Sequence, residues 1–316
     1  MGENAEGRHE AGGEVLVGPT LRTAPLIIDT DIGGDPDDAI ALVAAAHTTP
    51  ALALVTTTDE QDGERARFAR HLLDLLSRPN VPVVPGPDAQ SSYFCVDGLV
   101  PDTVPTPPGR VVDAVAELCR AADGPVRWLG IGPMTNLAAV LTAHPDLAHQ
   151  LHITQMGGAF NYRHADRAEH NISLDPDAAH AVLARAHRLR LVVSDITFTP
   201  QIEIAPGSPI DRGLAAQAAR DEVATDHTAT GWAALLYEHM DRWYENFYPA
   251  TMQHDGLTLT AALGLPYLDF APDSITLDAA GRMTRHPGGI PVHLSVAANY
   301  PAFLTWLTQA LQLDQR

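Results

Sequence analysis

Short apolar runs and helix-like segments alternate along the chain between residues 26 and 193. The apolar runs have the length of strands and lie at 26–28, 51–58, 81–84, 126–130, 153–156 and 191–193. The segments between them have helical spacing or helix-forming residues, at 38–46, 64–76, 111–122, 137–141 and 176–186. This order predicts an α/β fold in which a mostly parallel, Rossmann-like central sheet is flanked by helices.

After residue 200 the pattern becomes mostly helical, at 213–220 and 228–247. A last portion adds a helix at 257–263 and strands near 274–277 and 290–294. Residues 1–22 hold too little apolar surface to offset ordering, so we expect a disordered N-terminal tail. Neither a repeat nor a linker divides the rest, and we expect a single domain over residues 23–316.

Composition excludes several classes of function. The formal net charge of −19 argues against nucleic acid as a partner. The sequence contains no lysine, which removes Schiff-base chemistry and lysine-dependent phosphate sites. Its two cysteines are too few for a disulfide framework, and no apolar run reaches the ~20 residues that span a bilayer. We therefore expect a cytoplasmic protein without a membrane partner.

The most informative segment is 26–38, LIIDTDIGGDPDD, which has five carboxylates directly after an apolar run. They belong to Asp29, Asp31, Asp35, Asp37 and Asp38. Carboxylates at this density repel each other and resist burial unless a cation or strong hydrogen bonds compensate them. The glycines allow a tight loop, and oxygen ligands are those that Ca²⁺ and Mg²⁺ prefer. The segment thus predicts a site for a hard cation.

Three other interpretations explain this segment less well. Asp37 and Asp38 could simply cap the helix that follows while the rest stay solvated, which is common for two carboxylates but less so for five. A calcium loop of the EF-hand type starting at Asp29 would need a Glu where Ile40 stands. An aspartyl-phosphate phosphatase would need a phosphate-binding lysine, which the chain does not have.

Further motifs follow in order along the chain. The acidic segment, GPMTNLA at 132–138, MGGAF at 156–160, EHN at 169–171 with Asp175-Pro176, and His254-Asp255 resemble the signatures of the inosine-uridine-preferring nucleoside hydrolases. This resemblance implies the nucleoside hydrolase fold. It also implies hydrolysis of the N-glycosidic bond of ribonucleosides to base and ribose by a Ca²⁺-bound water, in nucleoside catabolism or salvage. A homo-oligomer of two or four subunits is implied as well.

Residue roles are implied by the same resemblance. Asp31, Asp38, Asp255 and the main-chain carbonyl of Thr135 would hold Ca²⁺, and Asp31 would also take a proton from the water. The ribose hydroxyls would be bound by Asp37, Glu169 and Asn171. His254 could protonate the departing base, or it could only orient Asp255.

The chain departs from the family pattern at several positions. Asp35-Pro36 lengthens the acidic loop, and Asp35 could compete for metal or sugar. Glu60 stands near the usual asparagine of the ribose side and could replace it, and Phe198 takes the place of a histidine. Two alternatives therefore stay open: a hydrolase of another N-riboside, and a non-catalytic metal and ribose binder. The aromatic residues within 228–247 have a helical spacing that favours core packing over stacking on a base.

Overall fold

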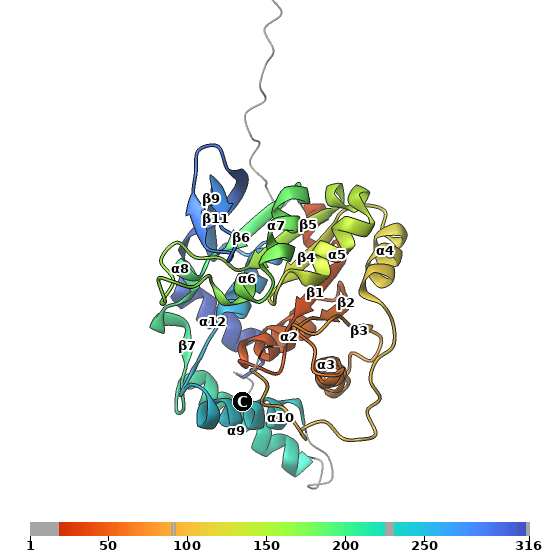
Figure 1. The fold of residues 1–316 in the computed structure, drawn as a ribbon. Coiled ribbons are helices and arrows are strands. Elements are labelled where there is room, and N and C mark those ends of the chain that lie inside the picture. Colours follow the sequence, from red (N-terminus) through yellow and green to blue (C-terminus); the bar gives the residue numbers. More distant parts are fainter. Residues whose placement is uncertain (1–18, 90, 92, 225–230, 314–316) are drawn as a thin grey trace, which may run out of the picture.

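The computed structural model describes residues 19–89, 91, 93–224 and 231–313. A nine-stranded sheet with the order β10-β9-β11-β6-β5-β4-β1-β2-β3 forms its centre (Figure 1). The parallel part consists of β1 (Leu26–Thr30), β2 (Leu52–Thr57), β3 (Val83–Pro85), β4 (Val126–Gly130), β5 (Leu151–Met156), β6 (Leu189–Val192) and β11 (Ile290–Ala298). Antiparallel β9 (Leu268–Leu277) and β10 (Met283–Arg285) complete one edge. The predicted fold class is confirmed.

Helices cover both faces of this sheet. On one face lie α2 (Asp37–Thr48), α3 (Glu64–Leu75), α11 (His254–Ala262) and α12 (Tyr300–Ala310). On the other lie α4 (Val111–Ala121), α5 (Thr135–Ala143) and α7 (Pro176–Arg185). Strand β1 shows why both faces must be covered, because Leu26 and Ile28 join the first apolar cluster and Ile27 joins the second.

Shorter elements connect these layers. They are α1 (Pro19–Arg22), α6 (His170–Leu174), α8 (Ser194–Thr197), β7 (Glu203–Ile204), β8 (Thr251–Met252) and the 3₁₀ turns Pro145–His149 and Pro200–Ile202. Helices α9 (Pro209–Ala224) and α10 (Trp232–Asn246) pack on each other at one end of the molecule (Figure 1). No helix among the described residues is both long and apolar enough to cross a membrane.

The ends of the chain differ in part from the sequence-based expectation. Residues 1–18 of the expected tail lie outside the described residues, but Pro19–Arg22 forms α1, with Leu21 only 6% exposed. The helix expected at 228–247 is described from Trp232 onward. Helix α12 was not predicted, although Phe303 and Leu307 are fully buried against the first apolar cluster.

Candidate functional site

A cavity of about 450 Å³ opens at the carboxyl ends of the parallel strands. Its floor includes Asp31 just after β1, Ile131 just after β4, and Met156 at the end of β5. Ligand sites in open α/β sheets lie at this edge. The other polar lining residues are Asp35, Asp37, Asp38, Arg163, Glu169, His170, Asn171, Ser194, Asn246, His254 and Asp255.

Three carboxylates meet inside this cavity. Asp37, Asp38 and Asp255 each place an oxygen within 4.8 Å of the other two, and each is at most 5% exposed. They meet because α2 and α11 pack together and both helices begin at the cavity. The backbone amide of Asp255 donates to Asp37 Oδ2 at 3.3 Å, and the Thr30 hydroxyl donates to Asp38.

Burial and mutual repulsion dominate the electrostatics of this cluster. Burial, and then the charges of neighbouring carboxylates, raise the pKa of Asp37, Asp38 and Asp255 well above the ordinary value of an aspartate. Buried carboxylates in this state are stabilised by a cation. An all-oxygen donor set of this kind suits a hard divalent ion such as Ca²⁺, so the residues fit the metal that the sequence suggested.

Asp31 lines the same cavity but lies outside the close group of three found among the described residues. Its carboxylate is packed against Gly132, where an added Cβ would lie 2.8 Å from Asp31 Oδ1. Burial raises the pKa of Asp31, whereas the nearby Arg65 guanidinium lowers it. Asp31 also contributes to the raised pKa of Asp38 and of Asp255, so its charge acts on the cluster.

The other two carboxylates of the acidic loop have separate surroundings. Asp35 lines the cavity and accepts a hydrogen bond from the Thr251 hydroxyl on β8. Asp29 is held below the floor, where its Oδ1 accepts from Thr56 Oγ1 and from Asn136 Nδ2, both at 2.7 Å. Burial raises the pKa of each to about 7.

Glu169 and Asn171, the expected ribose contacts, both line the cavity and are buried. The Glu169 carboxylate accepts backbone amides from Gly158, Asn171 and Ile172 at 2.9–3.3 Å, which fixes it at the start of α6. Asn171 Nδ2 donates to the carbonyls of Ile131 and Met156 at 3.1 and 3.3 Å. Both amide hydrogens are thereby engaged, so Asn171 would meet a sugar hydroxyl through Oδ1 as an acceptor.

Two residues expected in the site are not brought to it. Neither Glu60 nor Thr135 is among the described residues that line the cavity. Glu60 accepts the backbone amides of Arg65 and Ala66, at 3.2 and 3.1 Å, and so stabilises the first turn of α3. Thr135 begins α5, where its carbonyl faces along the helix, and its hydroxyl donates to Asp175 at 2.7 Å.

His254 lies at the start of α11 and faces the cavity. Its Nδ1 is 2.7 Å from Thr197 Oγ1, and its ring is stacked on Phe198 with 15° between the planes. Burial, with smaller contributions from Arg163 and His170, lowers the pKa of His254 to about 4.

Six aromatic side chains line the cavity: Tyr93, Tyr162, Phe198, Trp243, Phe247 and Tyr248. Tyr93, Trp243 and Phe247 contact one another, and we call these three the aromatic wall. Trp243 is stacked on Phe247 with ring centroids 5.0 Å apart, and Tyr93 lies 5.5 Å from Phe247. Trp243 is only 7% exposed and its Nε1 donates to the Ala250 carbonyl at 2.8 Å, in line with the expected core packing, and it also lines the cavity. The Tyr244 hydroxyl donates to the Ile204 carbonyl at 3.1 Å, and Tyr244 does not line the cavity.

Some lining residues were not singled out from the sequence. Ile131 could have been found, because it directly follows a predicted strand at the edge where sites gather. Tyr93 could not, since it lies in a Pro- and Gly-rich loop whose sequence has no period that reveals its direction.

Comparisons with known proteins point to one family. The family model described as inosine-uridine preferring nucleoside hydrolase matches residues 26–297. The pyrimidine-specific ribonucleoside hydrolase RihA of Salmonella agona (strain SL483) is 31% identical over 197 residues, 57% of this chain and 63% of that protein. The chain thus spans about 63% of the length of the curated relatives it matches.

Solved structures show the same fold. The purine-preferring ribonucleoside hydrolase of Gardnerella vaginalis superposes with a TM-score of 0.73 at 22% identity, over 92% of this chain and 98% of that one. The inosine-uridine preferring nucleoside hydrolase of Bacillus anthracis gives 0.72 at 18% identity, over 92% and 99%.

Proposed function

Since the chain belongs to the inosine-uridine preferring nucleoside hydrolase family, we propose that it hydrolyses the N-glycosidic bond of ribonucleosides, releasing base and ribose. The observation that carries this proposal is the convergence of Asp37, Asp38 and Asp255 in one cavity that Asp31, Glu169 and Asn171 also line. Curated relatives named as ribonucleoside hydrolases support the same reaction class.

Asp38 and Asp255 would hold a Ca²⁺ ion, with Asp31 at the side of the cluster. A main-chain carbonyl oxygen would be the remaining protein ligand of the ion. The sequence pointed to Thr135, but Ile131 lines the cavity and Thr135 does not, so we place this ligand at Ile131. The bound ion would supply a fixed water of lowered pKa.

Asp31 would accept a proton from the attacking water, because its carboxylate lies beside the cluster and is fixed against Gly132. Breaking the C–N bond leaves positive charge on the sugar, as in other glycoside hydrolysis. Asp31, Asp37 and Glu169 surround the place where that charge develops and stabilise it electrostatically.

Asp37, Glu169 and Asn171 would bind the ribose hydroxyls. Each offers acceptor oxygens from a buried position, and a 2′-deoxy sugar would leave such acceptors without a donor. We therefore expect a strong preference for ribonucleosides over deoxyribonucleosides.

His254 would assist the departing base. If Nδ1 accepts the Thr197 hydroxyl hydrogen across the 2.7 Å contact, the ring hydrogen stays on Nε2 and can be donated to the base. The aromatic wall of Tyr93, Trp243 and Phe247 offers faces on which the base can stack.

A ribonucleoside panel tests the proposal. Purified protein would be incubated with inosine, uridine, adenosine and cytidine, with Ca²⁺ or with excess chelator, and ribose release would be measured. We expect release from at least one ribonucleoside, lost with chelator and much slower with the 2′-deoxy analogue. Tight ribose binding without release would instead indicate a non-catalytic binder.

Two further expectations from the sequence stay predictions. One is a homo-oligomer of two or four subunits, which light scattering during gel filtration would measure. The other is a cytoplasmic location, which fractionation of the source cells would measure.

A further inference from the structure

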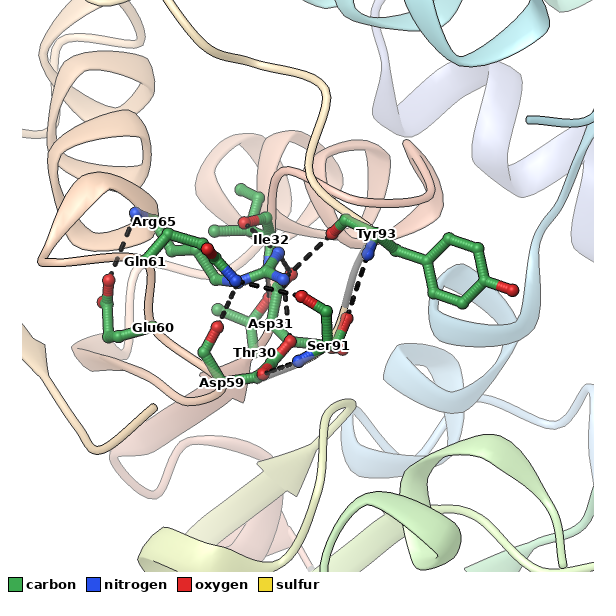
Figure 2. Close-up of polar contacts among 9 residues, drawn as sticks. All are labelled: Thr30, Asp31, Ile32, Asp59, Glu60, Gln61, Arg65, Ser91 and Tyr93. Carbon is green, nitrogen blue, oxygen red and sulfur yellow. Dashed lines mark hydrogen bonds and ion pairs between the residues drawn. The ribbon is translucent and has the colours of Figure 1, made fainter. Parts of the chain in front are cut away.

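A fully buried guanidinium lies beside the acidic loop. Arg65 belongs to the first turn of α3 and is 1% exposed, and Figure 2 shows its side chain surrounded by oxygen atoms. Its nitrogens donate to five acceptors on four residues: Asp31, Ile32, Asp59 and Tyr93. We call these residues, together with Arg65, the Arg65 network.

Two of these acceptors belong to the acidic loop itself. Arg65 Nη1 donates to the carbonyl of Asp31 and, at 3.0 Å, to the carbonyl of Ile32. The backbone of Asp31 is thus held from outside the cavity while its carboxylate lies inside. A side chain that fixes this peptide group also fixes the direction of the Asp31 carboxylate.

Asp59 supplies the next two acceptors. Arg65 Nε donates to the Asp59 carbonyl at 2.5 Å, and Nη2 donates to Asp59 Oδ2 at 2.8 Å. Asp59 adopts a left-handed backbone conformation with φ of 50°. In this conformation its carbonyl oxygen and its Oδ2 both face the Arg65 guanidinium. Asp59 thus pairs with Arg65 through both a carbonyl and a carboxylate oxygen, which fixes the direction of the guanidinium beside the acidic loop.

The last acceptor lies on the loop that carries Tyr93, one of the aromatic residues that line the cavity. Arg65 Nη2 donates to the carbonyl of Tyr93 at 3.0 Å. Ser91 is tied to the same place, since its amide donates to Asp59 Oδ1 at 2.9 Å and its carbonyl accepts from Gln61 Nε2 at 3.1 Å (Figure 2). The Tyr93 ring points away from the network in Figure 2 and lies 5.4 Å from the ring of His170 in the cavity lining.

We propose that Arg65 is a positioning residue that joins the acidic loop to Tyr93, so that cation binding and the position of Tyr93 at the cavity depend on one guanidinium. The inference rests on the proposed function, because it assigns the cavity to a cation and a nucleoside. The planar fork of arginine is required, since a lysine ammonium in the same place cannot reach acceptors on three separate segments.

The test compares Arg65→Lys with Arg127→Lys. Arg127 is a matched control, because it is 2% exposed and donates to the carbonyls of Ala24 and Ala262, which do not line the cavity. We expect Arg65→Lys to weaken binding of Ca²⁺ alone about tenfold in calorimetry and to speed amide hydrogen exchange at Ser91, Tyr93 and Cys95. Arg127→Lys should change neither, even if both variants lose similar thermal stability.

Two further variants keep the test decisive. In Arg65→Ala, millimolar guanidinium should restore Ca²⁺ affinity, which a general loss of stability would not allow. Gln61→Ala removes only the side-chain contact to Ser91, and it should speed exchange at Ser91 to a smaller degree. It remains informative if the Arg65 variants do not fold.

Unchanged Ca²⁺ affinity and unchanged exchange in Arg65→Lys, or equal effects in the Arg127 control, would overturn the inference. Failure of the proposed function is recognised separately. In that case the wild-type protein itself would bind no Ca²⁺ and release no ribose, while the exchange measurements would still report on the Arg65 network.

Discussion

The buried carboxylate of Asp38 is expected to lower the stability of the metal-free protein, although it is needed to bind the cation. It faces other carboxylates, and its Oδ1 accepts the Thr30 hydroxyl. Asp38→Asn keeps that acceptor and removes a charge. We expect the metal-free variant to be more stable by about 1 kcal/mol in urea unfolding, because repulsion falls. Its affinity for Ca²⁺ should fall at least ~10-fold, or by about 1.4 kcal/mol.

The matched control for this change is Asp113→Asn, which removes one charge of the exposed Arg110–Asp113 pair at the start of α4. It should alter neither property, since exposed ion pairs contribute little. A metal-free Asp38→Asn protein that is less stable than the wild type would contradict the account of the cluster.

Gly132 tests the placement of Asp31. A methyl group there would lie 2.8 Å from Asp31 Oδ1 and 2.8 Å from Thr58 Cγ2, so the carboxylate must move. We expect Gly132→Ala to lower kcat by about tenfold or more, since small displacements of a catalytic group are costly. Gly124→Ala, where an added Cβ has open space, is the control. Equal kcat in both variants would exclude the proposed role of Asp31.

His239 gives a prediction for pH dependence. It is fully buried on α10, its Nε2 donates to the Gly34 carbonyl at 2.9 Å, and its ring packs against Phe68. Burial first, and then the charges of Arg65 and Arg242, lower its pKa to about 4. An unfolded histidine takes up a proton below about pH 6.5, which the folded one resists, so stability is complete above that pH and falls toward pH 4.

We therefore expect wild-type protein to lose up to about 3 kcal/mol more than His239→Gln between pH 7 and pH 4. Urea unfolding at several pH values measures the difference between the two proteins. Parallel pH profiles would show that His239 is not the group responsible.

The sequence motifs indicated which residues line the cavity more reliably than they indicated what each residue contacts. Asp31, Asp37, Asp38, Glu169, Asn171, His254 and Asp255 all line one cavity. Thr135 was assigned from a motif, but its position as the first residue of α5 turns its carbonyl along the helix. Glu60 stabilises α3, because the nearby backbone amides use its carboxylate. The contacts of Thr135 and Glu60 depend on residues that are close only in the folded protein, and the spacing of residues in the sequence does not reveal them.

At the scale of elements, the period of apolar residues predicted the parallel strands and most helices. Helix α12 was missed, although Phe303, Leu307 and Ala310 recur at helical spacing and Pro301 stands in the first turn, where proline is favoured. The apolar period also gave only short strands where β9 and β11 run for ten and nine residues, because many of their side chains are only partly buried or exposed and so break the apolar run.

Helix α10 and its C-terminal end carry a prediction of their own. Phe247 is 39% exposed, lines the cavity and stacks on Trp243, whereas Tyr237 on the same helix does not line it. We expect Phe247→Ala to raise KM for the nucleoside about fivefold while Ca²⁺ affinity is unchanged, because one aromatic contact to the base is lost.

Tyr237→Ala should leave KM unchanged and serves as the control. Steady-state kinetics and Ca²⁺ calorimetry measure the two properties separately. If the KM of both variants rises equally, the aromatic wall is not the base-binding surface.

For the whole molecule, the order of strands explains why distant segments form one site. Strands β1, β4 and β5 are neighbours, so Asp31, Ile131 and Met156 meet at one edge although more than a hundred residues separate the first from the last. Helices α2 and α11 pack together on one face and bring Asp38 to Asp255. Sequence predicts the sheet, but the meeting of these helices follows only from the complete fold.

The central claim is that one divalent cation in this cavity is required for ribonucleoside hydrolysis. Its most direct test is ribose release by chelator-treated protein as Ca²⁺ is added back in known amounts. We predict that release returns and saturates at one equivalent of bound Ca²⁺ per chain, and that Asp38→Asn does not recover at that concentration. Equal release with and without the cation, or none at any Ca²⁺ concentration, would contradict the account.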